Sequence, residues 1–103
     1  MTTYNVFYSI KDDVDTHYVT CLIQEFVQLL AEQDLVESVT CSKLTNKGNF
    51  PEMPDFHLAV NFRNQDHMNE SFDTVRRTLM NEHPHAELMK STKEFKVTFS
   101  ESF

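Results

Sequence analysis

The sequence contains a single glycine, Gly48, and no tryptophan. Walker loops and dinucleotide-binding turns need several glycines, because their backbone must approach phosphate groups closely. ATP, GTP and NAD sites of the usual kinds are therefore disfavoured, and we expect no cofactor. No apolar run approaches the ~20 residues that a membrane-spanning helix needs, and the N-terminus lacks the basic and apolar segments of a secretory signal. We expect a soluble, cytoplasmic protein with no membrane partner.

Cysteine and positive charge are also scarce. Cys21 and Cys41 fall in a predicted helix and a predicted strand, and so sparse a pair in a chain without an export signal indicates two free thiols. Neither has a base or cation beside it in sequence, so nucleophilic catalysis is not supported. Sixteen acidic residues against nine basic ones leave a net charge of −7. Such an acidic chain repels phosphate backbones, and we expect no nucleic-acid partner.

What the chain does have is enough apolar surface for one core. Hydrophobic residues make up 40% of its 103 residues, and nine of them are Phe. A chain with this composition is too apolar to be disordered. The length is typical of one domain, so we expect residues 1–103 to fold as a single unit.

The clearest element of the sequence is the strand predicted from Asp55 to Arg63. Side chains alternate across a strand, so one face carries Phe56, Leu58, Val60 and Phe62. The other face carries His57, Ala59, Asn61 and Arg63. The first face is wholly apolar, whereas the second suits a cavity, a partner surface or solvent.

Periodicity divides the rest of the chain. A two-residue rhythm predicts further strands at Thr3 to Lys11, at Leu35 to Lys47 and around Phe95, Val97 and Phe99. Apolar residues at three- and four-residue steps predict one helix from about Thr16 to Gln33, capped by Asp15, and a second that is capped by Asn64 or Asp66 and ends before Pro84. The stretch from Ala86 to Thr92 is either one more helical turn or irregular.

The element order is therefore β-α-β-β-α-β, the split βαβ or ferredoxin-like arrangement of an α+β protein. Right-handed crossovers place both helices on one face of a four-stranded antiparallel sheet and leave the other face bare. Were that face to carry Phe7, Ala59, Val39 or their out-of-phase neighbours, it would be an exposed apolar patch, which a second copy of the chain can cover. We therefore predict a homodimer formed through the open sheet face.

This pattern resembles the dimeric α+β barrel superfamily, and within it the uncharacterised and stress-responsive bacterial branches. The features that carry the resemblance are a first strand ending in Ser9-Ile10-Lys11 before an acidic turn, a long helix, and a proline-containing loop that leads through Pro54-Asp55-Phe56-His57 into the third strand. They extend over nearly the whole chain. The resemblance implies a sheet-to-sheet dimer and, in catalytic members, a pocket between the sheet and its own helices.

Members of the superfamily catalyse unrelated reactions, so the resemblance implies no single activity. They include cofactor-independent monooxygenases, polyketide cyclases, haem-degrading enzymes, chlorite-dismutase relatives and muconolactone isomerases. The monooxygenases use Asn and Trp in the pocket, and haem degradation needs an axial His with Asn and Trp around the porphyrin. The absence of Trp counts against both, although Asn5 and Asn61 lie on strands where such residues could sit.

Among the polar residues, His57 is the leading candidate for a functional group, because an imidazole can act as a base or hydrogen-bond donor near neutral pH. We predict His57 and Asn61 as catalytic residues. The predicted ligand contacts are Asn5, Phe7, Thr40 and Phe72. Each has a structural alternative: the histidine could bond backbone or a dimer partner, the polar strand residues could lie at edges, and the aromatic rings could be core.

Metal binding is not expected from the histidines. His83-Pro84-His85 and the separate His17 and His67 supply imidazoles, but no HExxH or CxxC spacing accompanies them. The first two histidines fall at a predicted helix end, where His commonly serves as a cap that suits the helix dipole.

Two functions are compatible with these observations. In the first, a pocket between sheet and helices holds a small hydrophobic or aromatic molecule, oriented by His57 with Asn61 or Asn5. This function requires a cavity of at least ~300 Å³. In the second, the chain is a non-catalytic homodimeric structural or regulatory module, and its large Phe and Leu side chains fill that volume.

Overall fold

The computed structural model describes residues 1–103 and contains four strands and three helices. In chain order they are β1 (Thr2–Ile10), α1 (Thr16–Glu32), β2 (Ser38–Lys43), β3 (Phe56–Phe62), α2 (Gln65–Thr78), α3 (His85–Ser91) and β4 (Thr92–Glu101). The predicted order of strands and long helices is confirmed. The stretch after Pro84 is a third helix, α3, so the helical alternative for this stretch is the correct one.

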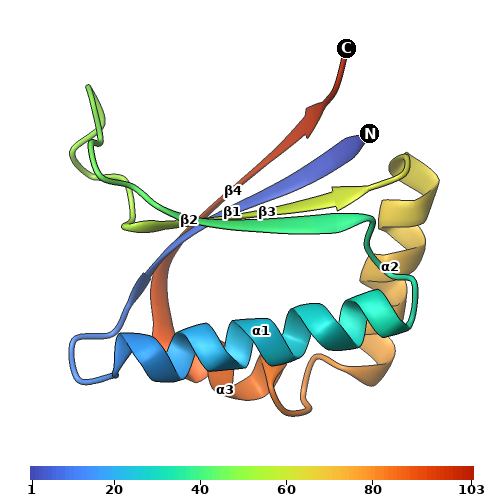
Figure 1. Cartoon of the computed structure of the whole chain (residues 1–103), viewed down its shortest axis with the longest axis horizontal. Coiled ribbons are helices and arrows are strands. Elements are labelled where there is room, and N and C mark those ends of the chain that lie inside the picture. Colours follow the sequence, from blue (N-terminus) through green and yellow to red (C-terminus); the bar gives the residue numbers. More distant parts are fainter.

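The four strands form one antiparallel sheet in the order β2-β3-β1-β4. The helices form a second layer on one side of this sheet, and the other side is open (Figure 1). The chain therefore has the predicted ferredoxin-like α+β arrangement. None of the three helices combines the length and the apolar character that a bilayer-spanning segment needs.

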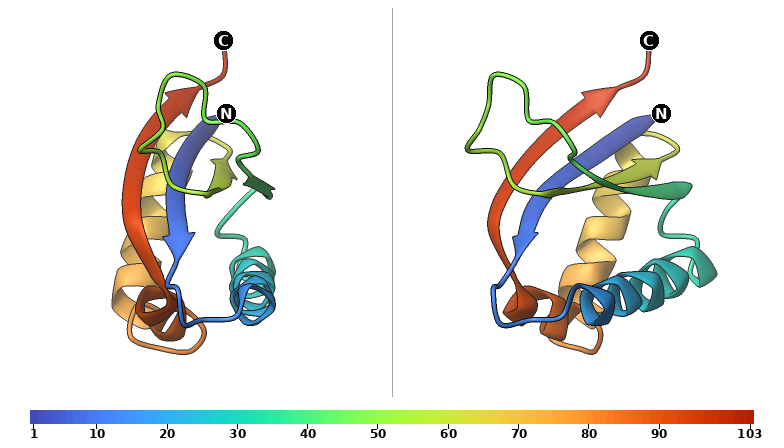
Figure 2. Two further views of the ribbon diagram at one scale, coloured as in Figure 1. Left: turned by 90° about the vertical axis from the view of Figure 1, so that its left-hand side faces the viewer. Right: turned by 60° about the vertical axis from the view of Figure 1, so that its left-hand side comes forward.

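Strand β4 is longer than the sequence pattern indicates. It begins at Thr92 directly after α3 and curves along the outer edge of the sheet (Figure 2). Its pairing with β1 shifts register between Phe7 and Ser9, and Glu94 on the opposing strand has a φ of 61°. At this point β4 has one residue more than β1, which is a β-bulge. A bulge bends a strand and increases its twist, so β4 can follow α3 without an intervening loop.

Alternation along the strands produces the two faces of the sheet. The face toward the helices carries Tyr4, Val6, Tyr8, Phe56, Leu58, Val60 and Phe62, all of which pack in the two apolar clusters. The prediction of one wholly apolar face for β3 is therefore confirmed. Val39 pairs with Val60 and also faces the helices, so among the residues considered for the open face Val39 does not lie there.

The buried apolar side chains form two clusters. The larger contains Leu30, Leu35, Val36, Val60, Phe62 and Met68, and the smaller contains Tyr8, Val19 and Ile23. The sequence pattern assigns Leu35 and Val36 to the second strand, but β2 begins only at Ser38. These two residues lie in the connection between α1 and β2, directly after a turn in which Asp34 has a φ of 55°, and the Leu35 N–H donates to the Leu30 carbonyl at 2.8 Å. A buried turn and the start of a strand have the same hydrophobic signature.

Both long helices begin at predicted caps. The Asp15 carboxylate accepts the backbone N–H of His17 at 3.3 Å, and Asn64 Oδ1 accepts the backbone N–H of His67 at 2.8 Å. Asn64, and not Asp66, is therefore the cap of α2. A cap satisfies a backbone donor that has no partner within the helix.

The substitution Asn64→Ala is expected to lower the free energy of unfolding by about 1 kcal/mol, because it leaves the His67 N–H without its acceptor. Asn69→Ala, on the exposed side of the same helix, is the matched control and should leave stability unchanged or slightly higher, since Ala favours helix. Urea unfolding followed by circular dichroism measures both. Equal losses in the two variants would contradict the capping role.

Candidate functional site

Five of the six predicted site residues lie together on the open face, the side of the sheet turned away from the helices. They are His57, Asn61, Asn5, Phe7 and Thr40. Phe7 pairs with His57, and Asn5 and Thr40 flank Ala59 from the two neighbouring strands. Their neighbours in each strand face the helices, so alternation turns these side chains the other way. The sixth residue, Phe72, belongs to α2.

Hydrogen bonds join residues of the open face into a network. His57 Nε2 donates to Asn5 Oδ1 at 3.0 Å, which requires the imidazole proton on Nε2 because an amide oxygen only accepts. Asn5 Nδ2 in turn donates to Ser100 Oγ at 3.2 Å. The Phe7 ring stacks on the His57 ring, with centroids 4.4 Å apart. The imidazole is thus held in place by one ring and one amide.

Asn61 forms the second part of this open-face network. Its Oδ1 accepts from Thr3 Oγ1 at 2.6 Å, and its Nδ2 donates to Ser38 Oγ at 3.0 Å. The side-chain amide is therefore bonded at both ends within the chain. The expected apolar patch is limited to Phe7 and Ala59, which lie among these hydrogen-bonded polar groups.

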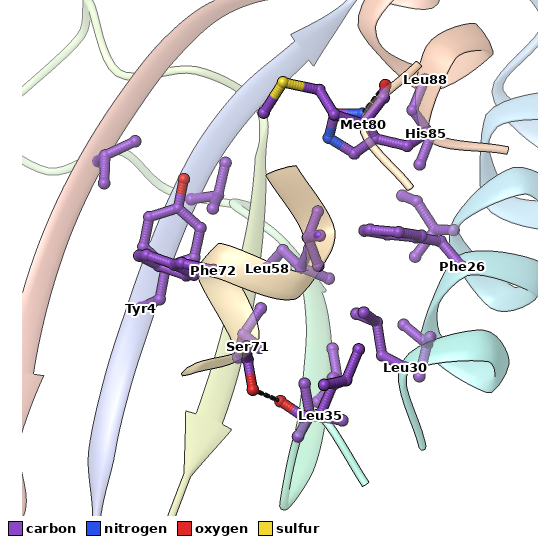
Figure 3. Close-up of a pocket in the computed structure, with 18 of the residues that line it drawn as sticks. Tyr4, Phe26, Leu30, Leu35, Leu58, Ser71, Phe72, Met80, His85 and Leu88 are labelled. Carbon is purple, nitrogen blue, oxygen red and sulfur yellow. Dashed lines mark hydrogen bonds between the residues drawn. The ribbon is translucent and has the colours of Figure 1, made fainter. Parts of the chain in front are cut away.

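The opposite face of the sheet borders a cavity of about 550 Å³. The cavity lies between the sheet and the three helices, and 20 of the 24 residues that line it are hydrophobic. In Figure 3 the rings of Tyr4 and Phe72 lie on one side of it and the ring of Phe26 on the other. Helices α1 and α2 cross at a steep angle instead of lying side by side (Figure 1), so the space between them is not closed by helix-to-helix packing.

Among the predicted site residues, only Phe72 lines this cavity. His57, Asn61 and Asn5 lie on the other face of the sheet, so the prediction that they orient a ligand in a pocket beneath the helices is wrong. The physical reason is the two-residue period of β3, which turns Leu58 and Val60 into the cavity and their neighbours away from it. Catalytic or binding roles for the open-face residues stay predictions.

His85 is a polar residue of the cavity that the sequence pattern does not identify as a reactive group. Its Nδ1 donates to the Met80 carbonyl at 2.9 Å (Figure 3). On a neutral ring, Nε2 is then an acceptor, and it has no hydrogen-bond partner within the chain. In the sequence, His85 looks like a helix-end residue. Only the approach of the Met80 carbonyl, from the turn between α2 and α3, shows which nitrogen is free.

Two phenols also line the cavity. Burial raises the pKa of Tyr4, and burial together with the charge of Cys41 raises the pKa of Tyr8 to about 12. Both groups therefore stay protonated near neutral pH, as hydrogen-bond donors. Neither hydroxyl is bonded within the chain, whereas Ser71 Oγ donates to the Leu35 carbonyl at 2.6 Å. The lining residues thus include two phenol donors and one imidazole acceptor in mostly apolar surroundings.

His67 has a structural role. Its side chain is buried, Nδ1 accepts the Arg63 backbone N–H at 3.1 Å, and Nε2 donates to the Asp34 carbonyl at 2.8 Å. Both ring nitrogens are therefore engaged. The two cysteines, Cys21 and Cys41, are exposed and unpaired. No group of three or more His, Cys, Asp or Glu residues is arranged to hold a metal ion.

His83 connects two of the helices that surround the cavity. Its Nε2 lies 2.6 Å from Glu25 Oε2 of α1, and its Nδ1 lies 3.0 Å from Glu87 Oε2 of α3. The hydrogen bond to Glu25 and then the one to Glu87 raise the pKa of His83, because both carboxylates favour the protonated imidazole. All three side chains are accessible to solvent, so water and salt weaken the ion pairs.

Residues 1–101 match the model of a protein family of unknown function, DUF6614. The chain belongs to this family. No curated protein matches it. Membership of DUF6614 agrees with the resemblance to an uncharacterised branch of the dimeric α+β barrels.

Several solved structures share the fold of this DUF6614 member. At3g17210 from Arabidopsis thaliana aligns with a TM-score of 0.75 at 15% identity, over 100% of this chain and 96% of that one. A dimeric protein of unknown function and ferredoxin-like fold from Bacteroides fragilis aligns with a TM-score of 0.56 at 16% identity, over 98% of this chain and 95% of that one. A dimeric ferredoxin-like protein of unknown function from Thermobifida fusca aligns with a TM-score of 0.61 at 12% identity, over 96% and 88%. These likenesses confirm the ferredoxin-like fold.

The raised pKa of His83 predicts a pH-dependent contribution to stability. The unfolded chain lacks the two carboxylate partners, so the folded state binds the imidazole proton more tightly. The added stability is present in full below the pKa of the unfolded state, and it is lost as the pH rises through the higher pKa of the folded state.

Thermal unfolding of the wild type and of His83→Gln, at about pH 5.5 and about pH 8.5 on either side of the ordinary histidine range, tests this prediction. The wild type should melt higher than the variant at the lower pH, and the difference should shrink at the higher pH. His17→Gln removes an exposed imidazole whose side-chain contact is with Cys21, and it is the matched control. A difference for His83→Gln that is equal at both pH values would rule out the carboxylate pairing as its cause.

Proposed function

We propose that the protein binds a small hydrophobic or aromatic molecule in the cavity between the sheet and the helices. The observation that supports this function is the volume of about 550 Å³ with a mainly hydrophobic lining. Ligand pockets in proteins typically begin near ~300 Å³ and combine apolar walls with a few polar groups. The non-catalytic alternative requires the large Phe and Leu side chains to fill this space, and they do not fill it.

The walls suit a ring or an apolar chain. Tyr4 and Phe72 meet edge to face with centroids 5.0 Å apart, and Phe26 is tilted against His85 with centroids 5.2 Å apart. Ring edges and faces of this kind accept a further aromatic group in offset or perpendicular contact. Each Å² of apolar ligand surface removed from water contributes roughly 25 cal/mol. Binding would therefore be driven mainly by burial.

The polar groups of the cavity orient the ligand in this proposal. Nε2 of His85 accepts a hydrogen bond from a ligand hydroxyl, and the phenols of Tyr4 and Tyr8 donate to a ligand carbonyl or hydroxyl. Should the bound molecule also be transformed, His85 is the group to accept its proton, since a neutral imidazole is a base near neutral pH.

A substitution that fills the cavity should abolish binding. Val27 of α1 lines the cavity, and Val27→Phe places a ring in the space that the ligand needs. The affinity for a neutral apolar fluorophore such as N-phenyl-1-naphthylamine should fall about tenfold or more. The reason is that the fluorophore loses burial comparable to that of one apolar side chain, which is worth about 1.5–3 kcal/mol. Fluorescence titration measures this affinity.

The matched control is Gln24→Phe, which adds the same ring to the exposed side of the same helix. This variant should bind the fluorophore as the wild type does. Unchanged binding in Val27→Phe, or an equal loss in both variants, would mean that the fluorophore does not occupy the cavity. Circular dichroism of both variants shows whether the fold is retained.

We also infer that two copies of the chain associate through the open face. The Bacteroides fragilis and Thermobifida fusca proteins of the same fold are described as dimeric, which supports self-association here. Phe7 and Ala59 supply apolar contact near the middle of this face. The amides of Asn5 and Asn61 are already hydrogen-bonded within the chain, so covering them carries a smaller desolvation cost than covering unbonded groups.

A dimer formed through the open face is compatible with a ligand in the cavity. If the cavity binds no ligand, formation of the dimer is the function of a structural or regulatory module. In this arrangement His57 and Asn61 serve the contact between copies, and catalytic or ligand-binding roles for them require a molecule bound on the open face. Asn5, Phe7 and Thr40 share that condition because they share that face.

A charge at the centre of the open face should separate the copies. Ala59 lies on β3 between Asn5 and Thr40, and Ala59→Arg places a long cationic side chain there. Light scattering after size exclusion should give twice 12.1 kDa for the wild type and 12.1 kDa for the variant. Asn69→Arg, on the exposed side of α2, should stay dimeric. A dimer that survives Ala59→Arg would place the contact elsewhere.

A further inference from the structure

We propose that the ligand of the cavity is an amphipathic carboxylate, whose apolar part fills the cavity and whose anionic head lies at Arg76. This inference rests on the proposed binding function and adds the chemical class of the ligand. It depends on three observations: the state of Arg76, its position at one end of the cavity, and the difference between the two ends.

Arg76 is the only Lys or Arg among the residues that line the cavity. Its guanidinium forms no ion pair and no hydrogen bond within the chain. The other two arginines are both paired, Arg77 with Asp73 at 3.1 Å and Arg63 with Asp34 at 3.0 Å. The planar fork of a guanidinium matches the two oxygens of a carboxylate. The structure therefore leaves one matching cation free, and it lies beside apolar walls.

Arg76 lines the same cavity as Met80 and His85. Residues four apart lie on the same face of a helix, so Arg76 follows Phe72 along the side of α2 that faces the cavity. Arg76 lies in the last turn of α2, and Met80 lies in the turn just after this helix. The Met80 carbonyl holds His85 Nδ1 at 2.9 Å. In Figure 3, Met80 and His85 lie at one end of the cavity, and Leu35 and Ser71 lie at the other.

The two ends differ in their access to solvent. Met80 and Met89 are 43% and 49% exposed, whereas Leu35 and Phe62 are 9% and 2% exposed. The cavity is therefore closed near Leu35 and open near Met80, and it is also open along β4, where the lining residues Phe95 and Val97 are exposed. An apolar tail that enters at Met80 reaches the buried end, and its head stays at the entrance beside Arg76. The volume of about 550 Å³ exceeds the ~300 Å³ at which ligand pockets typically begin, so it has room for a medium-length acyl chain.

The other charges of the chain explain why Arg76 should decide whether the cavity prefers a carboxylate to a neutral head group. The net charge of −7 disfavours anions at long range, so recognition of a carboxylate needs a contact at short range. The Nδ1 of His85 is already bonded to the Met80 carbonyl, so its side chain offers a carboxylate one nitrogen at most, whereas a guanidinium offers a pair of donors. Arg76 is the only permanent cation among the residues that line the cavity.

The experiment compares decanoate with 1-decanol, which has the same chain and a neutral head. Both are titrated into the full chain by calorimetry at fixed ionic strength, below the concentrations at which they aggregate. The wild type should bind decanoate about tenfold more tightly than decanol, as expected for a hydrogen bond to a charged group. Arg76→Gln should remove this preference and keep decanol binding, and Arg76→Lys, which retains the charge, should keep part of the preference.

Arg77→Gln is the matched control, because it removes a neighbouring arginine that is paired with Asp73 and does not line the cavity. This variant should prefer decanoate as the wild type does. The carboxylate inference would be overturned by equal affinities of the wild type for the two probes, or by equal losses of the decanoate preference in the Arg76 and Arg77 variants. In either case, binding of decanol would still uphold the cavity function. If neither the two probes nor N-phenyl-1-naphthylamine binds, the proposed binding function itself is wrong.

Discussion

Alternation of side chains along β1 and β3 is the constraint on which the rest of this molecule depends. Both strands have a hydrogen-bonded neighbour on each side, so their backbone groups are paired and only their two side-chain faces are available for other contacts. The face that carries Tyr4, Val6, Leu58 and Val60 has to leave water, and the crossover helices cover it. The other face stays open. One layer of sheet therefore separates the cavity from the open-face network.

The cavity is a consequence of how the covering layer is built. One buried cluster, around Leu35 and Phe62, and another, around Tyr8 and Val19, attach the helices to the sheet, while the steep crossing of α1 and α2 leaves the space between them unfilled. Empty volume destabilises a small domain, because the side chains around it lose contacts. An apolar ligand restores those contacts and favours the folded state by mass action. The binding proposal thus follows from packing and not from a sequence motif.

The open face follows a different physical logic. His57 is stacked on Phe7 and bonded to Asn5, and Asn61 is bonded at both ends, so the polar groups of this face are satisfied before any partner arrives. A surface of this kind can be covered by a second copy with little loss of hydrogen bonding. Because this face and the cavity lie on opposite sides of the sheet, association of two copies and binding of a ligand do not compete for the same residues.

The sequence by itself determined the order of the strands and the two long helices, the two faces of β3 and the cap Asp15, because each of these depends on periodicity or on contacts within a few residues. Local pattern also misled at Leu35 and Val36, where a buried helix end has the signature of a strand. Only the tertiary structure decided that His57 and Asn61 face away from the helices, that Phe72 alone of the predicted residues lines the cavity, and that His85 and Arg76 also line it. These features depend on strand pairing and on the angle between two helices far apart in sequence, and no local spacing encodes either of them.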